Sequence, residues 1–129
     1  MMFFIVDDDD SFRFLTTKAI ELTNPGTAIF DFENAKLALS KINDLNNEAK
    51  LLPDYIFLDL NMPIMDGWGF LDEIAVFYNS LNKPISIYVV SSSLYSADKQ
   101  KASTYPFVSG YIEKPLSFDC LNQLKSRTN

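Results

Sequence analysis

The fold of this chain is indicated most directly by residues 53–67, PDYIFLDLNMPIMDG. The run YIFL at 55–58 follows a Pro-Asp breaker and is rich in aromatic and branched residues, which is typical of a buried strand. The run is followed by Asp59, which stands between Leu58 and Leu60 in the sequence. A carboxylate at this position is costly to bury unless it is paired or bound to a cation. On its own, Asp59 could equally be an acid that leaves the sheet to cap a turn. Asp66-Gly67 then predicts a tight turn at the start of a helix.

Short apolar runs of the same kind recur along the chain, at 2–6, 27–30, 85–90 and 108–112. Between them, apolar residues at helical spacing predict three amphipathic helices. The expected inward faces are Phe12, Leu15, Ala19 and Leu22 in the first helix, Ala35, Ala38, Ile42 and Leu45 in the second, and Phe70, Ile74, Phe77 and Leu81 in the third.

Two weaker helices are predicted in the last third of the chain. They cover 96–104, with Ser96 as a candidate N-cap, and 117–126, with Ser117 as the cap and Leu121 and Leu124 facing inward. Strands and helices thus alternate five times, which predicts an α/β fold with a parallel sheet covered by helices on both faces. No repeat or linker interrupts the pattern, so we expect residues 1–129 to form a single domain.

The residues that end each run are the candidates for a site, because ligands of parallel α/β sheets bind at the carboxyl ends of the strands. The first run ends in Asp7-Asp8-Asp9-Asp10, the fourth in Ser91-Ser92-Ser93 and the fifth in Glu113-Lys114-Pro115. Each has a plain structural explanation by itself, namely a helix cap, a polar turn and a solvated loop. Together with Asp59, however, they would bring carboxylates, a hydroxyl and an ammonium to one edge of the sheet.

Such a cluster predicts a bound cation, because carboxylates a few ångströms apart repel and do not all stay ionised without one. Carboxylates, water and phosphate oxygens are the ligands that Mg²⁺ prefers. A nucleophilic carboxylate, a metal ion and a fixed positive charge are also the groups that stabilise phosphoryl transfer. We therefore expect a magnesium-dependent phosphoryl-transfer site. Asp9 and Asp10 are assigned to the loop and to the cap of the first helix.

The composition narrows the function classes. The 17 acidic and 11 basic residues give a net charge of −6, which argues against nucleic acid as a direct partner. The chain has no histidine and one cysteine, Cys120, which excludes histidine-based catalytic triads, a disulfide framework and a zinc cluster. No apolar run approaches the roughly 20 residues that span a bilayer, and the N-terminus lacks the pattern of a signal peptide, so we expect a cytoplasmic protein without a membrane segment.

On these residues the chain resembles the receiver domain of two-component response regulators. The resemblance extends from Phe3 to about Lys125 and is carried by Val6-Asp7-Asp8-Asp9, the D-x-x-M-P-x-M-D-G stretch 59–67, Val90-Ser91-Ser92-Ser93 and Gly110-Tyr111-Ile112-Glu113-Lys114-Pro115. It implies a flavodoxin-like, doubly wound five-stranded parallel sheet in the order 2-1-3-4-5. We expect residues 1–129 to be a single receiver domain with no output domain, because no pattern of a second domain follows the last predicted helix.

The resemblance implies a role for each residue at the strand ends. It assigns the phosphoacceptor role to Asp59 and Mg²⁺ binding to Asp7, Asp8, Asp59 and the backbone carbonyl of Asn61. It assigns phosphoryl binding to Ser91 and Lys114, and conformational switching to Ser91 and Tyr111. Pro115 occupies a position at which the family commonly has a cis peptide bond.

The function implied is a phosphorylation-driven switch. A histidine kinase or a histidine phosphotransfer protein would supply the phosphoryl group, since the chain itself has no histidine. The new negative charge on Asp59 would draw Ser91 and Lys114 toward it, and Tyr111 would turn inward. The face formed by the fourth helix, the fifth strand and the fifth helix would then bind an unknown downstream protein or a second copy of the chain. The domain would catalyse its own phosphorylation and dephosphorylation and would not otherwise be an enzyme.

Two alternative functions remain open on the sequence. A receiver-like module that binds partners without being phosphorylated would have the same fold, although the presence of all five strand-end residues argues against it. A phosphatase of the haloacid-dehalogenase type also begins with D-x-D after a strand. That class needs a second acidic motif near the C-terminus, which we do not find in residues 111–129.

Overall fold

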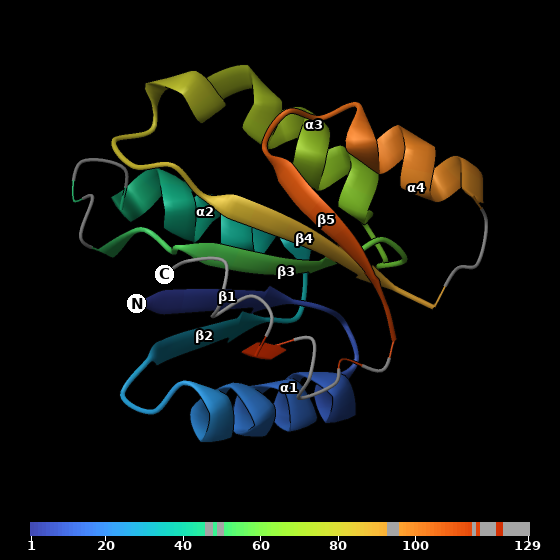
Figure 1. Cartoon of the computed structure of the whole chain (residues 1–129). Coiled ribbons are helices and arrows are strands. Elements are labelled where there is room, and N and C mark those ends of the chain that lie inside the picture. Colours follow the sequence, from blue (N-terminus) through green and yellow to red (C-terminus); the bar gives the residue numbers. More distant parts are fainter. Residues whose placement is uncertain (46–47, 49–50, 93–95, 115, 117–120, 123–129) are drawn as a thin grey trace.

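The computed structural model describes residues 1–45, 48, 51–92, 96–114, 116 and 121–122. In chain order the elements are β1 (Met2–Val6), α1 (Asp10–Thr23), β2 (Ala28–Phe32), α2 (Ala35–Leu45), β3 (Tyr55–Asp59), α3 (Gly67–Phe77), the 3₁₀ turn η2 (Tyr78–Ser80), β4 (Ser86–Ser91), α4 (Ser96–Ser103) and β5 (Val108–Glu113) (Figure 1). The five strands form one parallel sheet in the order β2-β1-β3-β4-β5, which confirms the predicted order. The predicted bounds of the first strand are confirmed, and those of the other four differ from the observed ones by at most two residues.

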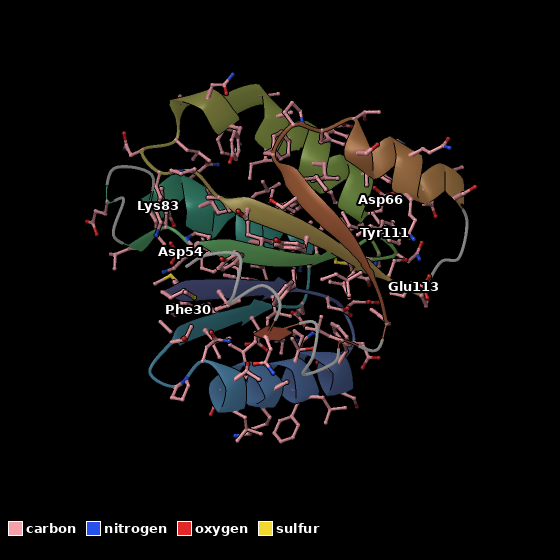
Figure 2. The ribbon with its side chains drawn as sticks, in the orientation of Figure 1. Phe30, Asp54, Asp66, Lys83, Tyr111 and Glu113 are labelled. Atoms are coloured by element: carbon pink, nitrogen blue, oxygen red, sulfur yellow. The ribbon has the colours of Figure 1, made fainter. Side chains whose placement is uncertain are left out.

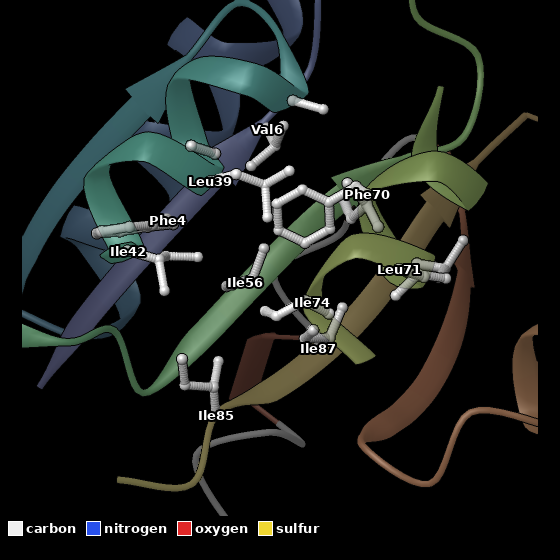
Figure 3. Packing of buried hydrophobic residues seen from close by; sticks show 14 of the residues in the cluster. Phe4, Val6, Leu39, Ile42, Ile56, Phe70, Leu71, Ile74, Ile85 and Ile87 are labelled. Carbon is white, nitrogen blue, oxygen red and sulfur yellow. The ribbon is translucent and has the colours of Figure 1, made fainter. Parts of the chain in front are cut away.

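The sheet separates two hydrophobic cores, because successive residues of a strand point to opposite faces. Figure 3 shows the larger core, in which β1, β3 and β4 pack against α2 and α3 through Phe4, Val6, Ile56 and Ile87 on the sheet and Leu39, Ile42, Phe70, Leu71 and Ile74 on the helices. On the other face, the buried residues are Phe3, Ile5, Tyr55, Phe57, Tyr88 and Val90 of the sheet with Ala19, Ile20 and Leu121. The helices therefore cover both faces, as predicted.

The two edge strands are more exposed than the prediction of buried strands allows. In β2 the residues Ala28, Phe30 and Asp31 are exposed, and β5 has Ser109 and Glu113 exposed. An edge strand has a neighbour on one side only, so helices placed over the sheet centre cover it incompletely. The runs that are buried throughout belong to the central strands β1, β3 and β4, apart from their first residues.

The predicted inward face of α1 is wrong in part. Leu15 and Leu22 are 65% and 72% exposed, whereas the buried residues are Thr16, Ala19 and Ile20. Apolar residues surround much of this helix, so helical spacing alone fits more than one face. The structure turns the flank with Thr16 and Ile20 toward the sheet, which leaves the flank with Leu15 and Leu22 in solvent.

The predictions for the other helices hold with smaller changes. The expected face of α2 is confirmed, since Ala35, Ala38 and Ile42 are buried and Leu45 is partly buried. The helix α3 ends at Phe77, so Leu81 lies beyond it, after the 3₁₀ turn. The helix α4 begins at Ser96, so this residue is the first of the helix rather than its predicted N-cap.

Several predictions near the C-terminus fall on residues that the structure does not describe, namely the cap at Ser117, Cys120, Leu124, the peptide bond of Pro115 and most of the helix at 117–126. Leu121 is buried in the core beside α1, as predicted. Within the described ranges, none of the helices combines the length and apolar character that crossing a membrane requires.

Candidate functional site

The pairing register brings the predicted strand ends to one edge of the sheet. The last residue of β1 pairs with the residue before Asp59, so Asp7 lies beside Asp59 on the neighbouring strand. Asp59 pairs with Val90, which precedes Ser91, and the partner of Ser91 in β5 directly precedes Lys114. The backbone N–H of Lys114 donates to the carbonyl of Ser91 at 3.0 Å. Four residues from four strands therefore converge, as the sequence predicted.

The centre of this edge is a lysine between two buried carboxylates. Lys114 Nζ lies 2.8 Å from Asp7 Oδ2 and 3.6 Å from Asp59 Oδ1. Asp7 is 1% exposed and Asp59 is 5% exposed, so both carboxylates are shielded from water. Buried charges of this kind are stable only when they are paired, and the lysine supplies one positive charge for two negative ones.

An ion pair at the amino-terminal ends of the strands provides a comparison. There Lys83 Nζ lies 3.0 Å from Asp54 Oδ1, and Figure 2 labels this pair at the start of β3, far along the sheet from Tyr111 and Glu113 on β5. The Asp54 side chain is 34% exposed and also accepts a hydrogen bond from the backbone N–H of Met2 at 2.8 Å. That pair is partly buried and joins one lysine to one carboxylate, whereas the carboxyl-end cluster holds excess negative charge in a buried place.

The acids of the cluster are close enough together to hold a metal ion. Asp7, Asp8 and Asp59 each offer a carboxylate oxygen within 4.8 Å of the others, and Asp8 is exposed. Asp7 Oδ1 accepts a hydrogen bond from the backbone N–H of Asp9 at 2.9 Å. The buried Oδ2 atom of Asp7 pairs with the lysine ammonium and has no other hydrogen-bond partner among the described residues. An all-oxygen donor set with one exposed member fits Mg²⁺, which keeps water ligands.

The pKa of Asp59 is higher than that of an ordinary aspartate, although a lysine lies beside it. Burial raises the pKa of Asp59, the nearby charge of Asp7 raises it further, and Lys114 lowers it, so that the pKa stands at about 6. The lysine alone therefore does not restore the usual acidity of this carboxyl group. For Lys114, burial opposes the charged form, but the hydrogen bond to Asp7 and the charges of Asp59 and Asp7 outweigh it and raise the pKa.

The loop that carries the acids is held by an arginine that the sequence did not reveal. Arg13 Nη1 donates to the backbone carbonyl of Asp7 at 2.7 Å, Nε pairs with Asp31 Oδ2 at 3.0 Å, and Nη2 pairs with Asp10. Asp9 caps α1 as predicted, since its side chain accepts from the backbone N–H of two residues in the first turn. No sequence signal marked Arg13, because its partners lie after β1, at the start of α1 and in β2.

Phe12 is a second residue that the sequence assigned only to a helix face. The Lys114 Nζ atom lies 4.4 Å from the centre of the Phe12 ring. The ring is partly buried and packs against the core between the sheet and α1. Phe12 therefore belongs both to the core and to the surroundings of the site.

The turn after β3 owes its shape to close approach and to a strained residue. A Cβ atom on Gly67 would lie 2.5 Å from the carbonyl oxygen of Asp59 and 2.8 Å from Leu60 Cα, so only glycine fits there. Gly67 begins α3 after Asp66, as predicted, and the residue of this turn with a left-handed backbone is Ile64, with φ of 72°. The backbone N–H of Asn61 donates to Asp59 Oδ1 at 3.4 Å.

The two predicted switch residues differ in burial. Ser91 is fully buried at the end of β4. Tyr111 is partly buried and packs against the core on the α2 and α3 side of the sheet, with Lys99 Nζ 5.9 Å from its ring centre. Figure 2 shows Tyr111 on β5 in the same half of the molecule as Asp66 and Glu113.

Known proteins share this fold and its sequence pattern. The family model described as the response regulator receiver domain matches residues 3–125. A two-component response regulator from Cytophaga hutchinsonii, known from its crystal structure, is 31% identical and superposes with a TM-score of 0.87 over 98% of this chain and 94% of its own. The phosphorylated cyanobacterial phytochrome response regulator RcpA is 25% identical, with a TM-score of 0.76 over 98% of this chain and 89% of its own.

A curated relative of a different size matches as well. The DNA-binding transcriptional regulator NtrC of Salmonella typhimurium is 30% identical over 115 residues, which are 89% of this chain and 22% of that protein. The likeness thus concerns one part of NtrC. With the family match over nearly the whole sequence and the strand order of the fold, these similarities show that the chain belongs to the response regulator receiver domain family.

Proposed function

We propose that Asp59 is the phosphoacceptor of this receiver domain and that Asp7, Asp8, Ser91 and Lys114 complete its transfer site. The observation that supports this most is the Lys114 ammonium, which lies within 4 Å of two buried carboxylates at the carboxyl edge of the sheet. A buried excess of negative charge at this place favours a cation, and the cation together with Lys114 would then neutralise the oxygens of a phosphoryl group. A role in signalling fits the family to which the chain belongs.

The proposed reaction is an in-line displacement at phosphorus. An oxygen of the Asp59 carboxylate attacks the phosphoryl group of a phosphohistidine in a histidine kinase or a phosphotransfer protein. The new O–P bond forms as the N–P bond breaks. The electron pair of the N–P bond stays with the donor's imidazole nitrogen, which takes up a proton. In the slower hydrolysis that follows, water attacks the phosphorus, the O–P bond to Asp59 breaks, and inorganic phosphate leaves with Asp59 restored as a carboxylate.

The proposal assigns a role in this reaction to each side chain of the site. Asp59 must be ionised to attack, and its pKa of about 6 leaves it mostly ionised at neutral pH. Lys114 neutralises charge on the phosphoryl oxygens, and the Ser91 hydroxyl donates a hydrogen bond to one of them. Asp7, Asp8, Asp59 and the backbone carbonyl of Asn61 would hold Mg²⁺, which supplies further neutralisation of the phosphoryl oxygens when it is bound.

The output of the switch would be a change in the face around α4 and β5. In the proposal, Lys114 and Ser91 move toward the new phosphoryl group, Tyr111 turns inward, and a downstream protein or a second copy of the chain binds this face. The described part of that face includes Lys99 beside Tyr111. A donor that is itself phosphorylated from ATP is consistent with the cytoplasmic location expected from the sequence.

The test is phosphorylation by a small donor. Wild-type protein incubated with Mg²⁺ and acetyl phosphate should gain the mass of one phosphoryl group, and the gain should be lost with hydroxylamine or on removal of Mg²⁺ during labelling. Asp59→Asn should stay unmodified. The matched control is Asp54→Asn, which removes a lysine-paired carboxylate at the amino-terminal ends of the strands and should be labelled normally.

Two outcomes would contradict the proposal. A wild-type chain that stays unmodified with acetyl phosphate and does not bind beryllofluoride would be a receiver-like interaction module. Multiple turnovers of a small phosphate ester at the rate of an enzyme would instead favour the phosphatase alternative.

A further inference from the structure

Lys114 reaches the site on a long side chain whose charged end needs to be held in place. Its four-carbon stem has many rotamers, and an ammonium near solvent can leave a carboxylate at little cost. The side chain is 22% exposed, so water has access to part of it. Two contacts hold the ammonium on the site, namely the buried acids Asp7 and Asp59 and the ring of Phe12, 4.4 Å away.

The Phe12 ring is itself held in position. Phe12 lies in the first turn of α1, and its backbone N–H donates to the capping side chain of Asp9 at 3.2 Å. The ring packs against the core cluster that contains residues of β1, β3 and α1. A ring with these restraints forms a fixed surface, and the flexible partner of the contact is the lysine.

This contact is tighter than most lysine contacts with aromatic rings in the described part of the chain. The longer ones have separations of 5.6–6.0 Å and are Lys18 over Phe14, Lys41 over Phe30 and Lys99 over Tyr111. Lys101 over Trp68 has the same 4.4 Å separation but joins α4 to α3. The attraction between a cation and a ring face is larger where water is displaced. Lys114 meets that condition, since it also contacts two buried carboxylates.

We propose that Phe12 is a positioning residue for phosphoryl transfer, and that its ring keeps the Lys114 ammonium directed at Asp7 and Asp59. The inference rests on the proposed function of the site. Without the ring, Lys114 spends more time in solvent, and the charge that it supplies to the phosphoryl oxygens is lost for part of the time. The carboxylates stay in place, because their own backbone contacts do not involve Phe12.

The proposal separates the rate of transfer from the affinity for Mg²⁺. The ammonium and a metal ion are attracted to the same carboxylates, so a Lys114 that leaves the site competes less with the ion. In Phe12→Leu, the rate of labelling by acetyl phosphate at saturating Mg²⁺ should fall by roughly threefold to tenfold, the range expected for losing one such contact. The dissociation constant for Mg²⁺, measured by calorimetry, should stay the same or decrease.

Two matched variants control for packing. Phe12→Tyr keeps the ring face and should restore the wild-type labelling rate. Phe14→Leu makes the same substitution two residues along α1, where the ring is 61% exposed and the nearby cation is Lys18, and it should be labelled as fast as the wild type. The small donor keeps partner docking out of the comparison.

A readout that needs no phosphorylation tests the contact itself. Phe12→Leu should lower stability more in the wild-type background than in a Lys114→Met background, measured by denaturant unfolding of the four proteins. Equal costs in the two backgrounds would overturn the proposal. So would an unchanged labelling rate in Phe12→Leu, a failure of Phe12→Tyr to restore the rate, or a weaker affinity for Mg²⁺ that accompanies the slower rate.

The result for the wild type distinguishes the two levels of the argument. A wild type that is never labelled would overturn the receiver function and this role of Phe12 together. A wild type labelled on Asp59, with Phe12→Leu labelled equally fast, would overturn the role of Phe12 alone.

Discussion

Asp59 shows how one buried side chain carries both the chemistry and a cost. Its carboxylate lies beside Asp7 in a place that water does not reach, and the pKa rises to about 6 although Lys114 is near. The same burial shields a future acyl phosphate from bulk solvent. The residue that defines the function therefore destabilises the metal-free protein at neutral pH.

The first prediction concerns this cost. The pKa of Asp59 is higher in the folded protein than in the unfolded chain. The contribution of this carboxyl group to the free energy of unfolding is therefore fully present below the unfolded-state pKa and is lost as the pH rises through the folded-state pKa. In metal-free buffer, Asp59→Asn should be more stable than the wild type above about pH 7, by roughly 2–3 kcal/mol, and equal to it below about pH 4. Urea unfolding across this pH range checks the expectation, which a constant difference would contradict.

Ile64 destabilises the protein in a different way, through a strained backbone conformation. A branched residue with φ of 72° is strained by about 1–2 kcal/mol. Because the Ile64 side chain is 81% exposed, hydrophobic burial offsets little of this strain. Ile64→Asn should raise the free energy of unfolding by about 1 kcal/mol, since asparagine tolerates the left-handed region. Val76→Asn, at an equally exposed helical position, should bring no such gain. A loss of stability in Ile64→Asn would show that its side chain has a partner.

Among the elements, α4 is the least anchored of the described helices. Ala102 is its one buried residue, and its other contacts include Lys101 over Trp68 and Lys99 near Tyr111. At its end, the hydroxyl of Tyr105 donates to Asp72 of α3 at 2.6 Å. By contrast α2 and α3 each bury four residues in the core. A helix held by surface contacts can shift without opening a core.

Hydrogen exchange measures this difference. The backbone amides of α4 should exchange faster than those of α2 and α3, and beryllofluoride with Mg²⁺ should change the protection of α4 and β5 more than that of α2. The comparison uses one sample with and without the ligand, so each helix is its own control. Protection of α4 as strong as that of α3 would argue against α4 as the moving element.

The whole molecule has a net charge of −6, and its acids are unevenly placed. Asp7, Asp8 and Asp59 gather at one edge of the sheet with a single lysine among them. A cation that binds there acts on the folded protein only, because the unfolded chain does not hold the three acids together. Mass action then converts metal binding into global stability.

The last prediction follows at this scale. Mg²⁺ at about a hundred times its dissociation constant should stabilise the wild type by about 3 kcal/mol in thermal or urea unfolding. Asp8→Asn should lose most of this gain, because it removes one of the three acids of the candidate metal site. The variant is a clean test, since Asp8 is exposed and its replacement leaves the Lys114 ion pair intact. Sodium chloride at equal ionic strength separates this effect from general screening of the −6 charge. A gain of the same size in Asp8→Asn would place the stabilising ions elsewhere.

The sequence by itself determined the order of strands and helices, the residues at each strand end and the family. Alternating periodicity and breakers such as Pro53 and Pro84 are local signals, and the parallel sheet follows from them. The acid pair, Asp59, Ser91 and Lys114 could be placed together because the carboxyl ends of parallel strands meet at one edge. Arg13 and Phe12 could not, since nothing local marks their partners.

Only the tertiary structure decided which face of α1 is buried, why Gly67 is required and how far Lys114 is from each acid. Helical spacing fits more than one face when apolar residues surround a helix. The close approach of Gly67 to Asp59 and the pKa of Asp59 depend on atoms that lie apart in the chain until the fold brings them together. Local patterns therefore determine the elements, whereas burial and charge at the site arise from contacts between them.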